Sequence, residues 1–119
     1  MDSALIIFSR SPYGHINIIE ASRVAQGLLV LDKTVACVFI GDGVISLLKN
    51  QEPAGIGVNS VKLALKYLVD AGVDFYALKD SLIERGLTEE MLDKEYNIKV
   101  IGIDELTSLQ DKFETSIFF

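Results

Sequence analysis

A single cysteine, a single histidine and an aspartate framed by two glycines are the residues of this chain best able to do chemistry. Cys37 could serve as a thiol nucleophile, and His15 could act as a general base or polarise a ligand. Asp42, in the stretch "GDG", could bind a metal ion or a ribose. A lone histidine needs a nucleophile beside it, and no serine or cysteine motif supplies one. What these residues can do therefore depends on the elements that position them.

Cys37 lies in the middle of the apolar run "VACVF". Free cysteine is among the most frequently buried residue types, and nothing in this run would activate the thiol. The pattern favours a core cysteine, with a sulfur-transfer role for Cys37 as the alternative.

The candidate ligand-binding residues are Tyr13, His15 and Asp42, which follow the first and second apolar runs. "GDG" is also typical of an ordinary turn in which Asp42 begins a helix. The stretch is not a phosphate-binding loop, because both G-x-G-x-x-G and G-x-x-x-x-G-K-[ST] are absent. His15 is equally well explained as a solvated loop residue.

Short apolar runs rich in β-branched residues predict five buried strands, at 4–8, 34–40, 73–78, 98–103 and 115–119. Helical spacing predicts helices between them, at 16–30, 44–50, 60–72, 80–86, 88–95 and 104–113, with a loop at 51–59. This alternation predicts one α/β domain over residues 1–119, with a mainly parallel five-stranded sheet and helices on both faces. Ligands of such sheets gather beyond the carboxyl ends of the strands. The candidate face is formed by the loops 9–15, 41–44, 77–81 and 104–106.

Composition narrows the class of protein further. The formal net charge of -6 and the absence of a basic stripe argue against direct binding of nucleic acid. One cysteine excludes an intramolecular disulfide and a cysteine-rich zinc site, which fits a reducing cytoplasm. The first residues do not resemble a signal peptide, and no segment reaches the roughly 20 apolar residues of a membrane helix. We expect no cofactor and no metal site.

Two further stretches raise questions of their own. "YALKDSLIERGL", residues 76–87, predicts a strand that turns into a short helix closed by Gly86, yet the turn carries no reactive group. Glu84 and Arg85 in it are typical of solvated charges at a helix end. The last residues, Ile117, Phe118 and Phe119, are too apolar to stay in water, so they should pack on the core or on a partner.

Three stretches together resemble one family: "FSRSPYG", "VFIGDGVISLLKNQEP" and "SLIERGL". Their order and spacing are similar to the DsrE/DsrF/DsrH group, most closely to its DsrF/TusC-like branch. The resemblance implies a three-layer α/β/α fold and soluble cytoplasmic proteins that form oligomers, including a heterohexamer with two copies each of E-, F- and H-type subunits. It also implies sulfur relay, in which a persulfide passes between cysteines for tRNA thiolation or sulfur oxidation.

In the E-type carriers of this family, the acceptor cysteine stands at the start of the helix after the third strand. The matching positions here are Ala77, Leu78 and Lys79, and none is a thiol. The resemblance, together with the missing thiol, therefore indicates a non-catalytic subunit that binds DsrE-like and DsrH-like subunits, or itself. From its acidic composition and the lack of a long apolar segment, we expect no direct contact with nucleic acid or membrane. The alternatives are a homo-oligomeric domain that binds a small ligand or regulates, and a sulfurtransferase that uses Cys37.

Overall fold

The computed structural model describes residues 1–11, 17–49 and 58–119, so Tyr13, His15 and most of the expected loop at 51–59 lie outside the described residues. Five strands form one sheet in the order β4-β3-β2-β1-β5, and each neighbouring pair is parallel. The predicted parallel five-stranded sheet is confirmed. The strands are β1 (Ser3–Phe8), β2 (Thr34–Phe39), β3 (Asp74–Leu78), β4 (Lys99–Ile101) and β5 (Thr115–Phe118).

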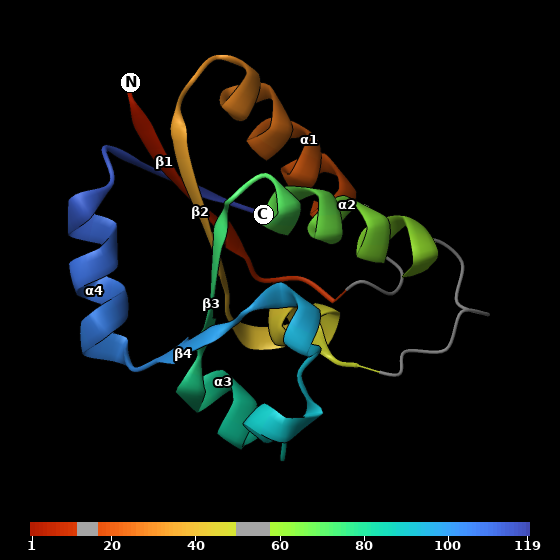
Figure 1. The fold of residues 1–119 in the computed structure, drawn as a ribbon. Coiled ribbons are helices and arrows are strands. Elements are labelled where there is room, and N and C mark those ends of the chain that lie inside the picture. The colour runs from red at the N-terminus through yellow and green to blue at the C-terminus, as the bar shows by residue number, and fades with distance from the viewer. Residues whose placement is uncertain (12–16, 50–57) are drawn as a thin grey trace.

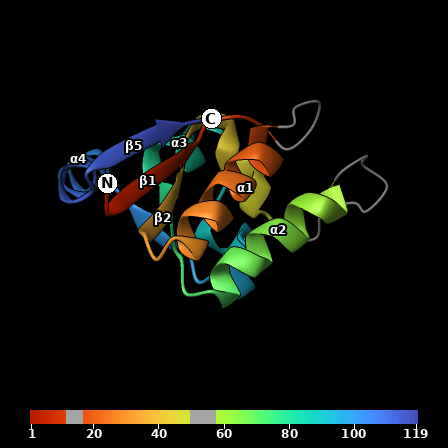
Figure 2. The ribbon, with the colours of Figure 1, turned by 90° about the horizontal axis from the view of Figure 1, so that it is seen from above.

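Helices cover both faces of the sheet, as Figures 1 and 2 show, so the three-layer arrangement is confirmed as well. Helices α1 (Asn17–Val30) and α2 (Val58–Asp70) lie on one face, and α4 (Ile103–Lys112) lies on the other. The sheet grows in one direction from β1 to β4, and the chain then returns to place β5 beside β1. Because parallel crossovers are right-handed, this reversal of direction puts α4 on the opposite face.

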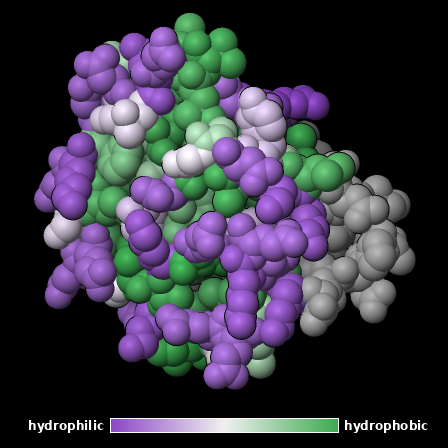
Figure 3. Space-filling model, viewed as in Figure 1, coloured by the Kyte–Doolittle hydropathy of each residue, from purple (hydrophilic) through white to green (hydrophobic). Residues whose placement is uncertain are grey.

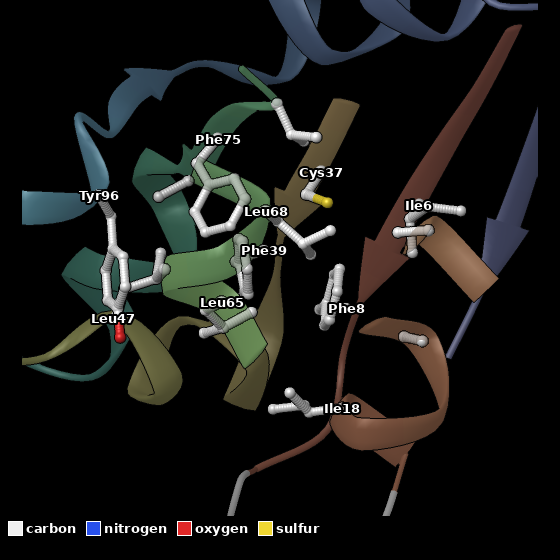
Figure 4. Packing of buried hydrophobic residues seen from close by; sticks show 14 of the residues in the cluster. Ile6, Phe8, Ile18, Cys37, Phe39, Leu47, Leu65, Leu68, Phe75 and Tyr96 are labelled. Carbon is white, nitrogen blue, oxygen red and sulfur yellow. The ribbon is translucent and has the colours of Figure 1, made fainter. Parts of the chain in front are cut away.

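The larger core cluster fills the space between the sheet and the helices α1 and α2. Alternate strand residues point into it, as the period of two along a strand requires. Aromatic rings form a continuous row across it, with centroid separations of 4.5 Å for Phe8–Phe39, 5.2 Å for Phe39–Phe75 and 5.8 Å for Phe75–Tyr96. This row, seen in Figure 4, joins three strands to the segment that precedes β4. Such ring pairs each contribute about 0.5–1.5 kcal/mol beyond the area they bury.

A smaller cluster lies on the other face, under α4. Residues from β1, β2 and β4 meet the apolar side of this single helix there. The buried members are Leu5, Ile7, Ala36, Val38, Ile101 and Leu109.

The predicted helix at 88–95 is wrong, because the segment forms two short 3₁₀ turns, Glu89–Met91 and Lys94–Tyr96. Between these turns the chain pairs with a distant segment: Leu92 forms an antiparallel bridge with Leu48 and is buried in the core. This pairing takes the backbone groups that a continuous helix would use. The predicted short helix at 44–50 is likewise a 3₁₀ helix and begins earlier, at Gly41–Leu47.

On the face seen in Figure 3, hydrophilic and hydrophobic side chains are interspersed. Apolar residues are exposed where α1 ends, at Val30 and Leu31, and on α3 (Lys79–Glu84), at Ile83. Across the described ranges, no helix has the length and apolar character needed to cross a bilayer.

Candidate functional site at the carboxyl ends of the strands

The turn after β2 and the start of α3 are joined at the carboxyl edge of the sheet. Gly41 takes a left-handed backbone conformation with φ of 52°, and its N–H donates to Ser81 Oγ at 2.8 Å. Gly43 lies so close to β1 that a Cβ atom there would overlap the carbonyl oxygen of Phe8. Two loops of the predicted face, 41–44 and 77–81, are therefore joined by a hydrogen bond, and the first of them also packs closely against β1.

An ion pair crosses the same junction. Arg85 Nη2 lies 3.0 Å from Asp42 Oδ1, and Arg85 Nε donates to the same oxygen at 3.1 Å. Arg85 Nη1 also donates to the carbonyl oxygen of Ser81 at 3.1 Å. The Arg85 side chain is only 27% exposed, so the expectation of a solvated helix-end charge is wrong for Arg85. It holds for Glu84, whose side chain is 72% exposed.

This contact changes the interpretation of Asp42. Its side chain is 59% exposed, but one carboxylate oxygen is already held by the Arg85 guanidinium. Among the described residues, the contacts of Asp42 therefore connect the turn after β2 to the end of α3. Ser81 lies in the predicted loop 77–81, but its contact with Gly41 and the contact of Arg85 with Asp42 were missed, because the partners stand 40 and 43 residues apart and no local pattern signals them.

The three positions that the family resemblance assigns to a carrier site differ sharply in exposure. Ala77 is fully buried, and Leu78, the residue that precedes α3, is 8% exposed. Lys79, the first residue of α3, is exposed. The predicted strand, turn and short helix are thus present at this junction. A thiol is absent at all three positions, so the junction itself cannot hold a persulfide.

Cys37 lies in the interior of the molecule, in the middle of β2 (Figure 4). It pairs in register with Ile6 on one side and with Phe75 on the other, and its exposure is 0%. Burial raises the pKa of the Cys37 thiol far above its usual value, because a thiolate would lose its hydration there. The reactive form of this thiol is therefore suppressed, and the predicted core cysteine is what the geometry supports.

Two hollows lie near the strand ends, on different faces. One of about 260 Å³ adjoins Lys79 and is walled by Leu82, Ile83 and Leu87. The other, of about 320 Å³, lies beside α4 and includes Tyr76 and residues of the expected loop 104–106. Asp104 lines this second hollow, whereas Asp42 lines neither of the two. No group of three or more acidic, histidine or cysteine side chains able to hold a metal occurs within 1–11, 17–49 and 58–119.

The apolar carboxyl-terminal residues divide between core and surface. Ile117 and Phe119 pack against the larger core cluster, and Phe119 N–H donates to the carbonyl oxygen of Ile7 at 2.8 Å. Phe118 faces the other side of the sheet and is 62% exposed. Ile117 and Phe119 therefore pack on the core as expected, whereas Phe118 remains largely in solvent.

The fold and this junction define a class: a three-layer α/β/α domain whose strand-to-helix junction carries no thiol at positions 77–79. The profile of the DsrE/DsrF-like family matches residues 2–119, and the chain belongs to that family. Protein TusC of Buchnera aphidicola subsp. Baizongia pistaciae is 34% identical over 97 residues, which cover 78% of this chain and 82% of that protein.

A second relative carries a different name. Intracellular sulfur oxidation protein DsrF of Allochromatium vinosum is 36% identical over 84 residues, or 70% of this chain and 62% of that protein. The sequence resemblance to the DsrF/TusC-like branch is confirmed by these two matches.

Solved structures agree on the fold. The ychN protein of E. coli superposes with a TM-score of 0.84 at 21% identity, and the alignment covers 100% of both chains. Protein MTH1491 of Methanobacterium thermoautotrophicum, described as of unknown function, gives a TM-score of 0.74 at 14% identity, again over 100% of both chains.

Proposed function

We propose that this chain is a non-catalytic subunit of a sulfur-relay complex, in which a homologous subunit carries the persulfide cysteine. The observation that carries the proposal is the position of the only thiol. Cys37 is fully buried in a central strand, while the carrier-site positions hold Ala77, Leu78 and Lys79. The names of the relatives, TusC and intracellular sulfur oxidation protein DsrF, support the same field of chemistry.

Sulfur transfer depends on whether the two reacting sulfur atoms can reach each other. A persulfide moves when a thiolate attacks the outer sulfur of a donor persulfide, so both sulfurs must meet at a surface. Cys37 meets neither condition, because it is enclosed and its thiolate is disfavoured. Lys79 is exposed, but an amine does not replace a thiol in this exchange. Sulfur must therefore travel through another chain.

The junction is well suited to a structural role. Leu78 is held below the surface, and the Gly41–Ser81 and Asp42–Arg85 contacts fix the turn around it. A surface of this kind can bind and orient a neighbouring subunit without rearranging. DsrE-like and DsrH-like subunits are the partners we propose, with Ile117, Phe118 and Phe119 as candidate contacts. The pathway served would be tRNA thiolation or sulfur oxidation.

Co-expression with a cysteine-bearing DsrE-like subunit from the same genome tests the proposal. We expect one mixed species by size exclusion and native mass measurement, with the cysteine of the partner labelled by persulfide-specific reagents. A Cys37→Ala variant should support the same sulfur flux as the parent chain, since Cys37 takes no part in it. Separate species, or loss of flux in a folded Cys37→Ala variant, would contradict the proposal.

A further inference from the structure

The two edges of the sheet are protected very differently. The β4 edge is only three residues long and carries Lys99, whose Nζ lies 3.8 Å from Asp74 Oδ1 and 5.5 Å from the centre of the Tyr76 ring. An edge lysine is a common way of preventing strand-to-strand association. Length hardly separates the two edges, since β4 has three residues and β5 has four. The β5 edge, Thr115–Phe118, has neither a charge nor a proline within it. Figure 2 shows β5 along the border of the ribbon, with β1 beside it.

The hydrogen bonds of β5 show which of its groups face outward. Phe119 N–H donates to Ile7 O, and Phe119 O accepts from Ser9 N–H, so residue 119 faces β1. Backbone groups of successive strand residues point to opposite sides, so Ile117 also faces β1. The N–H and C=O groups of Ser116 and Phe118 then point away from the sheet. In the part of the chain that the structure describes, no hydrogen bond to these four groups from beyond the edge is present.

We propose that the β5 edge is an interaction surface that takes the β5 edge of a second copy of this chain, antiparallel to it. The spacing of the outward groups is self-complementary. If Ser116 of one copy lies opposite Phe118 of the other, both pairs are of the hydrogen-bonded type, and four backbone hydrogen bonds form around a two-fold axis. The axis passes beside Ile117, which then lies opposite its own counterpart.

The side chains agree with this register. Residues directly opposite each other in an antiparallel pair share a face of the sheet. Phe118, which is 62% exposed, would lie across from Ser116 of the second copy on the α4 face. Ile117, which is partly buried on the α1 face, would meet Ile117 of the second copy as a β-branched pair. No charged side chain within β5 opposes another, so the chain's negative net charge is not concentrated at this contact.

The contact is small, because four residues a side bury less than the roughly 1,200 Å² of a standard stable interface. The association should therefore depend on concentration. It does not rest on the proposed sulfur-relay role, since it concerns the isolated chain only.

The test is a mass measurement by analytical ultracentrifugation on the isolated full chain, from about 1 µM to about 500 µM, a range that spans weak association. Ser116→Pro removes an outward N–H while leaving the bonds to β1, because proline is tolerated where the N–H of an edge strand faces solvent. Ser116→Ala is its matched control and keeps the N–H. Phe118→Lys places a charge on the edge without emptying the core.

We expect a monomer–dimer equilibrium in the parent chain and in Ser116→Ala, and a dissociation constant at least about tenfold higher in Ser116→Pro and Phe118→Lys. Amide exchange at Ser116 and Phe118 should slow as concentration rises, while thermal melting shows that each variant is folded. A monomer at every concentration overturns the proposal. So does an oligomer with an odd number of copies, or a dimer that persists unchanged in a folded Ser116→Pro or Phe118→Lys variant.

Discussion

Alkylation of Cys37 gives the strictest test of the buried thiol. The residue lies in the second of three consecutive central strands, with Ile6 and Phe75 as its register partners, and no fraying end is near. A small reagent such as iodoacetamide therefore reaches it only when the sheet opens. If opening requires most of the free energy of unfolding, about 5 kcal/mol or more, the accessible fraction is below about one in a thousand.

The assay compares alkylation rates at pH 8 in buffer and in denaturant, followed by mass spectrometry. We expect the native rate to be at least about a thousandfold slower than the rate of the unfolded chain. A Cys37→Ala/Lys79→Cys variant is the control, because position 79 is exposed and its thiol should react like a free one. A native rate within about tenfold of the unfolded rate would refute the burial argument and restore Cys37 as a candidate sulfur acceptor.

Three further predictions concern the junction and the core. Gly43→Ala should lower the free energy of unfolding by about 1–3 kcal/mol, because the added Cβ would meet the carbonyl oxygen of Phe8 in β1. Gly27→Ala, whose added Cβ lies in open space on α1, should raise it slightly, and thermal and urea melts measure both changes. A double-mutant cycle on Asp42→Ala and Arg85→Ala should give a coupling energy of about 0.5 kcal/mol, and a coupling of zero would contradict a stabilising ion pair. Arg85→Ala should be the more destabilising single change, because it also removes the hydrogen bond to the carbonyl oxygen of Ser81. Tyr96 should ionise at a higher pH than a free tyrosine in an absorbance titration, because burial and then the charges of nearby carboxylates raise its pKa. Its raised folded pKa favours the neutral ring, so its contribution to stability is complete below about pH 10 and falls as pH rises above that; Tyr96→Phe should remove the late step.

The strands were predictable because their apolar runs are continuous. Runs such as 4–8 and 34–40 are buried on both faces of the sheet. Each end of an observed strand lies within two residues of the predicted end. The sheet class followed from alternation with helices. The segment 88–95 failed because its helical composition is overruled by the bridge between Leu48 and Leu92, a contact that local sequence does not encode.

The candidate site was likewise only partly predictable from the sequence. That Cys37 is a core residue could be inferred from its own strand, since its neighbours in sequence are apolar. The contact between Asp42 and Arg85 could not, because it spans 43 residues and joins two turns that only the finished sheet brings together. Tyr13 and His15, which lie outside the described residues, stay predictions as ligand-binding residues.

The way the junction is built has a consequence for the residue at position 79. Its turn is fixed by Gly41, Ser81, Asp42 and Arg85, and by the close approach of Gly43 to β1. None of these contacts involves the side chain of Lys79, which projects from the first residue of α3 and is exposed. The identity of that residue is therefore under little constraint from folding. A substitution at this one position could therefore add or remove a reactive group while the contacts that fix the turn stay in place.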